Sequence, residues 1–399
     1  MARAWQCRSR STCVGNGGHW ELHRSMFIVN VYNGYVQRPG QGGGIRYLRN
    51  LVQEQGRLGA DVRVLGFGDG PVAEIAIGEA KVRYAPISRD CPWPRFMWQL
   101  VKHIARNRSQ YKTAIFHIHR PYFAPAIRLL LPASRIVLTI HTHTFSVFAD
   151  KHPELAWLVS FFICLERLIL RTCVDRVTVA SEALGQFYAA RHRGICKNLD
   201  VLMCLHGVSE APPMLIPEVR GRKFIVVSGR LAPVKRPLSA LRLWAAAMAI
   251  DPPLRNTHCL AFIGDGELGA AMAREIQSLG LGDCVLALGQ QASDQMPAIY
   301  AASQGLLLTS EQEGGGPYVV YEALACGKPV FSTAVGSVPD IVTPDSGIII
   351  PVGQPETRVQ ELVRFLRTAY APSACRARAE AYYDRCTTRF AQISEGIYD

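Results

Sequence analysis

The stretch EGGGPYVVYEALACGKPV, running from Glu313 to Val330, places a glycine run and a proline between two carboxylates. Three consecutive glycines let a backbone approach a ligand closely, and the first turn of a helix offers unpaired N–H groups that favour an anion. Pro317 suits the first position of a helix that carries the second carboxylate, Glu322, and Gly327 suits its end. The stretch therefore predicts a turn suited to phosphate, then a helix, then a buried strand over 329–334.

On both sides of this stretch, short β-branched runs alternate with helical periods, which is typical of parallel sheets covered on both faces. In the first part we expect strands at 27–32, 62–65, 114–118, 136–140, 177–180 and near 201–205. In the second part we expect strands at 224–228, 260–263, 284–288, 305–309, 330–332 and 347–350. The fold class is therefore α/β, with two Rossmann-like, doubly wound domains.

The domain boundaries follow from composition. A polar, proline-containing linker over 209–222 separates an N-terminal domain, 26–209, from a C-terminal domain, 210–379. The tail 380–399 is helical and aromatic. Residues 1–25 lack the apolar core of a signal peptide, so they are either a disordered basic tail or precede a true start at Met26.

Charge is distributed unevenly along the 399 residues. Residues 26–209 contain 23 Lys and Arg against 12 Asp and Glu, whereas 210–399 contain 17 against 19. The basic first half predicts affinity for phospholipid headgroups, a lipid-linked pyrophosphate or nucleic acid. Because no nucleic-acid recognition motif is present, we expect no nucleic-acid partner.

The twelve cysteines form no CxxC pair, which predicts neither a zinc site nor a disulfide framework and fits a reducing cytosol. Four of them sit in apolar runs and are predicted to be small buried side chains: Cys164, Cys204, Cys259 and Cys284.

Two cations follow the first strand of the C-terminal domain. Arg230 comes directly after that strand and Lys235 five residues later, so both can point at one diphosphate. The alternative is a solvated loop with ordinary surface charge. Gly264, in a Gly-Asp-Gly sequence after the next strand, is by itself only a turn signal.

Histidines end two successive strands of the N-terminal domain, in FHIHRP (116–121) and TIHTH (139–143). A lone histidine at a strand end is more often hydrogen-bonded structure than a catalyst. Two such motifs at neighbouring strand ends face the same edge of a sheet, which favours a functional role for His119 and His141. No carboxylate accompanies them at ligand spacing, so we expect no metal ion.

Two apolar segments concern membranes. The segment 93–111 predicts a helix with Met97, Leu100, Val101 and Ile104 on one side and basic residues near its end, which could lie in a headgroup layer or be a core helix with a solvated basic face. The segment 155–165 is too short to span a bilayer and predicts a buried helix.

The segment 313–330 resembles the signature of the retaining glycosyltransferases of family 4 (group 1, GT-B fold), which include bacterial lipopolysaccharide, exopolysaccharide and mannolipid transferases. The resemblance covers 27–398 and implies two Rossmann-like domains facing a cleft, with the last helix crossing back to the first domain. It also implies that Glu313 touches the donor sugar and Glu322 holds the ribose. The family has seven residues between these carboxylates and this chain has eight, so Glu313 is displaced by one position and Glu311 is the weaker substitute.

The resemblance assigns further residues of the C-terminal domain. Gly315 and Gly316 belong to the donor loop. Arg230 and Lys235 match the phosphate-binding pair, which would stabilise the charge on the departing diphosphate. Gly264 matches the turn that shapes the nucleotide pocket.

In the N-terminal domain the resemblance places Gly43 and Gly44 in a loop that approaches the donor phosphate and the acceptor. It places His141 beside the reacting carbon of the sugar, and His119 could position the acceptor. The rival explanation for the glycines, a dinucleotide-binding fingerprint, is disfavoured, because its spacing is not met and no acidic residue ends the next strand.

Together these features predict a retaining glycosyltransferase that moves a sugar from a UDP- or GDP-sugar to a hydroxyl of a glycan or polyprenyl-diphosphate-linked acceptor, without a metal. We expect front-face attack, because no nucleophile is evident in the first domain. The expected location is the cytoplasm, at the inner face of the membrane. Two alternatives remain: a nucleotide-sugar epimerase on the same scaffold, and a non-catalytic assembly protein that binds sugar nucleotides.

Overall fold

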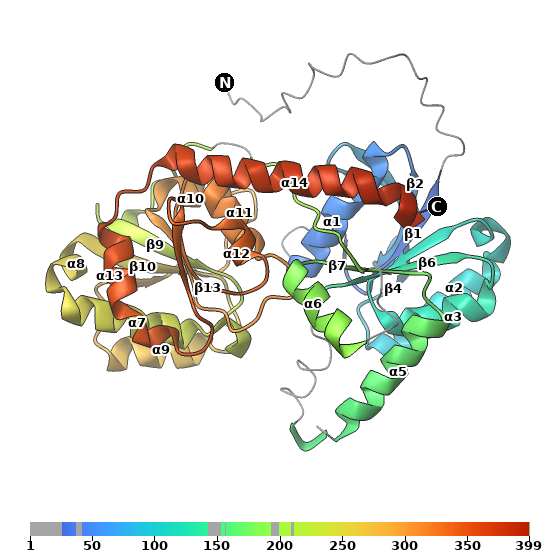
Figure 1. Cartoon of the computed structure of the whole chain (residues 1–399), viewed down its shortest axis with the longest axis horizontal. Coiled ribbons are helices and arrows are strands. Elements are labelled where there is room, and N and C mark those ends of the chain that lie inside the picture. The colour runs from blue at the N-terminus through green and yellow to red at the C-terminus, as the bar shows by residue number, and fades with distance from the viewer. Residues whose placement is uncertain are drawn as a thin grey trace, which may run out of the picture. The chain divides into compact units, whose positions relative to one another are not determined.

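The structure is a computed structural model that describes residues 26–36, 42–142, 153–155, 157–192, 199–208 and 211–398. The chain forms two compact units, each with its own sheet and core (Figure 1). The described residues up to Leu205, together with 386–398, form the N-terminal unit, and His206–Arg385 form the C-terminal unit. The tail 1–25, including its expected disorder or later start, lies outside the described residues.

The described part of the N-terminal unit contains an eight-stranded sheet in the order β3-β4-β2-β1-β5-β6-β7-β8. Its strands are β1 Phe27–Val31, β2 Asp61–Phe67, β3 Ala73–Ile77, β4 Ala80–Ser88, β5 Ile115–Ile118, β6 Arg135–Ile140, β7 Arg176–Val179 and β8 Leu199–Val201. All neighbours pair in parallel except β3 and β4. The order reverses at β1, which confirms the doubly wound topology.

The antiparallel hairpin β3–β4 was not expected from the sequence. Its two strands are joined by Gly78 and Glu79, and Gly78 has a φ of 59°, which a glycine adopts without strain. The alternating run from 73 to 88 around this glycine is the pattern that would have predicted it.

Helices cover both faces of this sheet. Helix α1 (Gly42–Arg57) lies on one face, and α2 (Trp93–Arg106), α3 (Ala124–Leu130), α5 (Leu158–Thr172) and α6 (Glu182–Arg191) lie on the other. Strand residues alternate accordingly: Val29 and Val31 enter the core under α2 and α3, whereas Asn30 faces α1 and bonds Gln55.

Helix α2 begins at Trp93 as predicted but ends at Arg106, and a short 3-10 helix, Arg108–Tyr111, follows it. Its side chains Phe96, Leu100 and Ile104 are buried in the core, so the segment 93–111 is the core helix with a solvated basic face rather than a helix with its apolar side available to lipid.

Helix α5 contradicts the prediction of a buried helix over 155–165. Only Glu166 and Leu170 of its described residues are buried, because the side that carries Glu166 faces the unit. Cys164 is consequently exposed, whereas Cys204, Cys259 and Cys284 are buried as predicted.

The C-terminal unit contains, within its described residues, a six-stranded parallel sheet in the order β11-β10-β9-β12-β13-β14. Its strands are β9 Lys223–Ser228, β10 His258–Ile263, β11 Val285–Ala287, β12 Gly305–Leu308, β13 Val330–Thr333 and β14 Gly347–Ile350, all at the predicted places. Its helices are α7 Pro237–Ile250, α8 Pro252–Thr257, α9 Gly269–Ser278, α10 Met296–Ala302, α11 Tyr318–Ala325, α12 Val338–Ile341 and α13 Val359–Arg367. The core is built around Trp244 of α7, whose side chain is fully buried.

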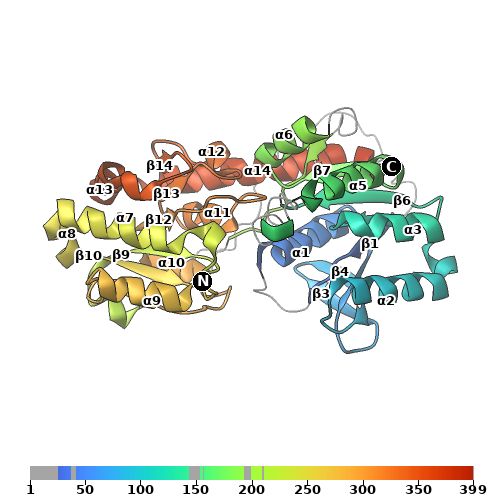
Figure 2. The same cartoon turned by 90° about the horizontal axis from the view of Figure 1, so that it is seen from below.

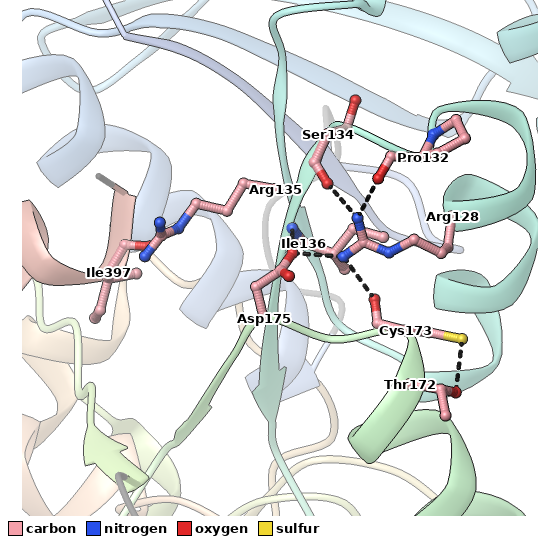
Figure 3. A network of polar contacts seen from close by, with 9 residues as sticks. All are labelled: Arg128, Pro132, Ser134, Arg135, Ile136, Thr172, Cys173, Asp175 and Ile397. Carbon is pink, nitrogen blue, oxygen red and sulfur yellow. Dashed lines mark hydrogen bonds and ion pairs between the residues drawn. The ribbon is translucent and has the colours of Figure 1, made fainter.

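The last helix, α14 (Pro372–Tyr398), begins earlier than the predicted 380 and belongs to both units. Its final turn packs on the N-terminal unit, as the resemblance implied. Arg135 of β6 donates hydrogen bonds to the carbonyls of Ile397 and Gly396, both at 3.1 Å (the contact with Ile397 is drawn in Figure 3). Tyr398 is buried there.

Candidate functional site

The carboxyl ends of β9 and β12 bring two of the predicted residues together in the C-terminal unit. Lys235 ends the short helix Pro233–Lys235 that follows β9, and its Nζ lies 2.5 Å from Oε1 of Glu313, in the loop after β12. The same carboxylate oxygen accepts a hydrogen bond from Ser310 Oγ at 2.7 Å. A cation and a carboxylate are therefore held side by side at the edge of the sheet where ligands bind in such folds.

Glu311 and Glu313 have different partners. Arg236 contacts Glu311 through Nη2 and Nε, at 3.1 and 3.2 Å. The Glu311 side chain is 54% exposed, whereas that of Glu313 is 11% exposed. The geometry therefore favours Glu313 over Glu311 as the carboxylate at this edge of the sheet.

Glu322 is buried on α11, where its carboxylate lies 3.6 Å from Nε2 of His206. Pro317 is the residue before the helix rather than its first residue, since its ψ of 110° is extended. Helix α11 is also shorter than the predicted three turns. Gly327, with a φ of 75°, ends it as expected, because a left-handed residue is favoured just after a helix.

The glycines around these carboxylates allow backbones to approach. A Cβ on Gly336 would lie 2.2 Å from the carbonyl oxygen of Gly315, so the loop containing Gly315 and Gly316 packs directly on the turn after β13. A Cβ on Gly264 would lie 2.0 Å from the carbonyl oxygen of Gly229, next to Arg230. Gly264 thus shapes the loop that carries Arg230, whose own side chain is exposed.

Three histidines at the ends of β5 and β6 lie together in the N-terminal unit. His119 Nδ1 is 2.9 Å from His141 Nε2, and the His117 and His119 rings stack with centroids 5.1 Å apart. His117 also bonds Thr139 at 2.6 Å and Tyr398 at 2.8 Å. The two histidine motifs therefore meet at one edge of the sheet, as their places at neighbouring strand ends predicted, although His143 lies outside the described residues.

Burial keeps these imidazoles neutral. The pKa of His117 is lowered to about 3 by burial and then by His141, and that of His141 is lowered to about 3 by burial and then by the nearby Arg120 guanidinium. The pKa of His119 is also lowered well below its ordinary value, by burial and then by His141. A neutral imidazole can donate or accept a hydrogen bond without bringing a charge to a sugar hydroxyl.

Gly43 and Gly44 lie in the first turn of α1, but their surroundings differ. A Cβ on Gly43 would meet nothing within 4 Å, whereas a Cβ on Gly44 would lie 2.4 Å from the hydroxyl oxygen of Tyr32. The Tyr32 ring is in edge contact with His119, with centroids 5.7 Å apart. Gly44 is therefore required by packing, and Gly43 leaves open space at the start of the helix.

Comparison with known proteins identifies the family. Residues 216–382 match the family model described as "Glycosyl transferases group 1", and residues 42–196 match the "Glycosyl transferase 4-like domain". The D-inositol 3-phosphate glycosyltransferase of Rhodococcus opacus (strain B4) is 32% identical over 382 residues, which cover 86% of this chain and 84% of that protein. The chain belongs to the group 1 glycosyltransferases.

The matches differ in length. In three other relatives that carry the same name, the matched segments cover only 28% to 39% of the relative. Among solved structures, this glycosyltransferase resembles the sucrose-phosphate synthase of Thermosynechococcus elongatus, with a TM-score of 0.73 and 20% identity over 94% of this chain and 99% of that one. It also resembles Anabaena HepE in complex with UDP-glucose, with a TM-score of 0.67 and 17% identity over 93% and 99%. These likenesses show the GT-B fold.

Three residues of the candidate site were not predicted. His206 lies beside Glu322, and Tyr398 joins the histidine cluster from the end of the chain. No local pattern links such distant positions. Arg120 follows His119 directly, so a cation next to a strand-end histidine was the feature that could have predicted it. In the part of the chain that the structure describes, no group of three or more His, Cys, Asp or Glu side chains is arranged to hold a metal ion.

Proposed function

We propose that this group 1 glycosyltransferase transfers a sugar from a nucleoside-diphosphate sugar to a hydroxyl of a glycan or lipid-linked acceptor, with retention of configuration at the anomeric carbon. The observation that carries the proposal is the contact of Lys235 with Glu313 beside the buried Glu322 helix. HepE, which shares the fold, is named as a complex with UDP-glucose. A UDP- or GDP-sugar is therefore the proposed donor.

The charges in the C-terminal unit suit the two ends of such a donor. Lys235 and the exposed Arg230 would bind the diphosphate, and Glu322 would accept hydrogen bonds from the ribose hydroxyls. Glu313 would bind sugar hydroxyls while Lys235 and Ser310 hold its carboxylate in place. Because two cations would stabilise the departing diphosphate, we propose that transfer needs no metal ion.

The proposed chemistry is a front-face substitution. The bond between the anomeric carbon and the diphosphate oxygen breaks, and the acceptor oxygen bonds to the same face of that carbon. The acceptor's proton passes to the departing diphosphate, so no protein base is required. We assign His141 to a sugar hydroxyl, since its neutral imidazole would bind it without adding charge.

The acceptor is proposed to carry a phosphate. The relatives are named for D-inositol 3-phosphate, and the N-terminal unit is the basic half of the chain. Arg120 adjoins the histidine cluster, and its Nε is buried without a hydrogen-bond partner among the described residues. A phosphorylated alcohol or a polyprenyl diphosphate would supply the missing anion. Synthesis of a cell-surface polysaccharide or glycolipid, on the cytoplasmic side and next to the membrane, is the role that we propose.

Donor binding is tested by measuring the melting temperature with UDP-, GDP- and ADP-sugars, because a ligand that binds only the folded state raises it. We expect one nucleotide class to raise the melting temperature, and Lys235→Gln to abolish the shift. Lys223→Gln is the matched control. Lys223 is exposed at the start of β9, whereas Lys235 follows the end of that strand. Absence of a shift with every nucleotide sugar, or an equal shift in Lys235→Gln, would overturn the proposed donor site.

A further inference from the structure

Helix α5 presents its apolar side chains to solvent. Five exposed residues at helical spacing, here called the α5 stripe, are Trp157, Phe161, Cys164, Leu165 and Leu168. The four apolar members are 73%, 60%, 41% and 58% exposed, in that order. Spacings of three and four residues place them on one side of the helix, opposite the buried Glu166 and Leu170. A surface helix normally has the reverse arrangement, with its apolar side inward.

Polar contacts hold α5 in this orientation. Glu166 lies 3.2 Å from Nε2 of His192, and both side chains are buried. At the other end of the helix, the Arg128 guanidinium binds the carbonyl of Cys173 and the carboxylate of Asp175, as Figure 3 shows. A buried carboxylate that loses its polar neighbour is costly, so these contacts favour the arrangement in which the side of α5 that carries Glu166 faces inward. The stripe has no part in them.

The neighbouring helices continue the same kind of surface. Helices α2, α3 and α5 lie side by side on one face of the sheet (Figure 2). Helix α2 adds Trp93 and Trp98, which are exposed, and Lys102 lies over the Trp98 ring at 4.9 Å. Helix α3 adds Leu129, the most exposed apolar residue of this face.

The charge of this surface is predominantly positive, although exposed carboxylates adjoin it at Asp90, Glu154 and Asp175. Helices α2 and α3 contain no Asp or Glu, and the one carboxylate of α5, Glu166, is buried. The exposed charged residues of these helices include Arg95, Arg106, Arg167 and Arg171. Exposed tryptophans, large aliphatic side chains and an excess of cations are the composition that binds the headgroup layer of an anionic bilayer.

We propose that the α5 stripe, with the basic surface of α2 and α3, docks this protein on an anionic membrane surface. The stripe would enter the boundary between headgroups and acyl chains, and the arginines would contact lipid phosphates. The chain would lie on the bilayer rather than cross it. At 1.5 Å per residue, the 15 residues of α5 are shorter than the hydrocarbon layer. No helix in the described ranges is long and apolar enough to span a membrane.

The proposal gives the membrane location a structural basis that differs from the one expected from the sequence. There, the segment 93–111 was considered for insertion through its apolar side, which is buried in the core. The proposal does not rest on the transferase reaction. Donor binding is measured without lipid and membrane binding without donor, so either can fail alone.

Membrane binding is tested by sedimentation of the full chain with vesicles of phosphatidylcholine alone and of phosphatidylcholine mixed with phosphatidylglycerol. We expect binding to the mixed vesicles that weakens at high salt. The affinity of the variant Phe161→Ser/Leu168→Ser for the mixed vesicles should be at least about tenfold lower, because two large apolar side chains are no longer transferred from water to lipid. Brominated lipid should quench the tryptophan emission of the unaltered protein, a readout that needs no variant.

The matched control is Leu215→Ser/Ile250→Ser, which removes two exposed aliphatic side chains from the C-terminal unit and should leave binding unchanged. Arg171→Gln should weaken binding more than Arg274→Gln, which removes an exposed charge from α9. Three outcomes overturn the proposal: no binding by the unaltered protein, equal binding by the Phe161→Ser/Leu168→Ser variant, or a lipid-free dimer that this variant converts to monomer. The last outcome would assign the stripe to a second copy of the chain.

Discussion

At the residue scale, Gly43 and Gly44 need to be glycine for different reasons. Gly43 faces open space that a ligand could use, whereas Gly44 packs against Tyr32. Gly43→Ala would place its Cβ in open space and replace a helical glycine, so we expect equal or higher stability, by up to about 1 kcal/mol. If a ligand approaches this backbone, the transfer rate should nevertheless fall, on the order of tenfold. Melting temperature and initial rate, measured on the same preparation, check both expectations.

Gly44→Ala is the comparison for that variant. Its Cβ would press on the Tyr32 hydroxyl, so the ring has to move and the melting temperature should fall. Full transfer activity in Gly43→Ala would show that no ligand uses the open space at the start of α1.

The buried histidines predict how stability depends on pH. An unfolded histidine titrates near 6.5, whereas His117 and His141 have a folded pKa of about 3. Between these values the unfolded chain binds protons that the folded unit does not, so the free energy of unfolding falls as pH falls below about 6.5. The loss reaches about 1.4 kcal/mol per pH unit for each histidine.

Melting temperatures of the unaltered protein and of His141→Gln, recorded from pH 7 to pH 5, check this expectation. The variant should show the shallower decline, because its unfolded chain has one histidine fewer to take up a proton in this range. Parallel profiles for the two proteins would show that His141 is protonated as easily in the folded unit as in the unfolded chain.

At the scale of elements, periodicity predicted most of the fold, because β-branched runs bounded by glycine form strands wherever they are buried on both faces. Periodicity failed for α5, where a contact with a distant residue determines which side of the helix is buried. The hydrophobicity of 155–165 predicted burial, but the Glu166–His192 pair turns the apolar side outward, and His192 is not part of that segment. An element's own composition says how apolar it is, and its partners determine which side meets the core.

In the candidate site, too, local sequence predicted the position of residues but not their contacts with distant partners. Its position after a strand predicted that Lys235 belongs to the sheet edge at which such folds bind ligands, and the resemblance predicted the role of Glu313. The two residues follow β9 and β12, which are parallel neighbours. The 2.5 Å contact between them joins residues 78 positions apart. Beside it, the turn at Gly336 packs against Gly315 and Glu313, and no spacing within either loop encodes that packing.

At the scale of the whole molecule, the end of the chain completes the core of the N-terminal unit. The Tyr398 hydroxyl accepts a hydrogen bond from Gln55 at 2.7 Å and bonds His117 at 2.8 Å, and all three side chains are buried. Residues 386–398 thus supply part of a unit that otherwise ends at Leu205. The core of this unit is therefore complete only with residues 386–398 in place.

Tyr398→Phe tests this dependence. It keeps the ring and removes the hydroxyl, so Gln55 Nε2 and His117 Nδ1 keep only their 3.3 Å contact with each other, at a cost of about 1–3 kcal/mol. Hydrogen exchange should accelerate in β1, β5 and β6, whereas the strands of the C-terminal unit should keep their protection. Tyr383→Phe is the matched control, because Tyr383 lies on α14 before residue 386 and stacks on Tyr321 of the C-terminal unit. Equal loss of protection in both units would mean that the hydroxyl supports the helix as a whole rather than the core that it enters.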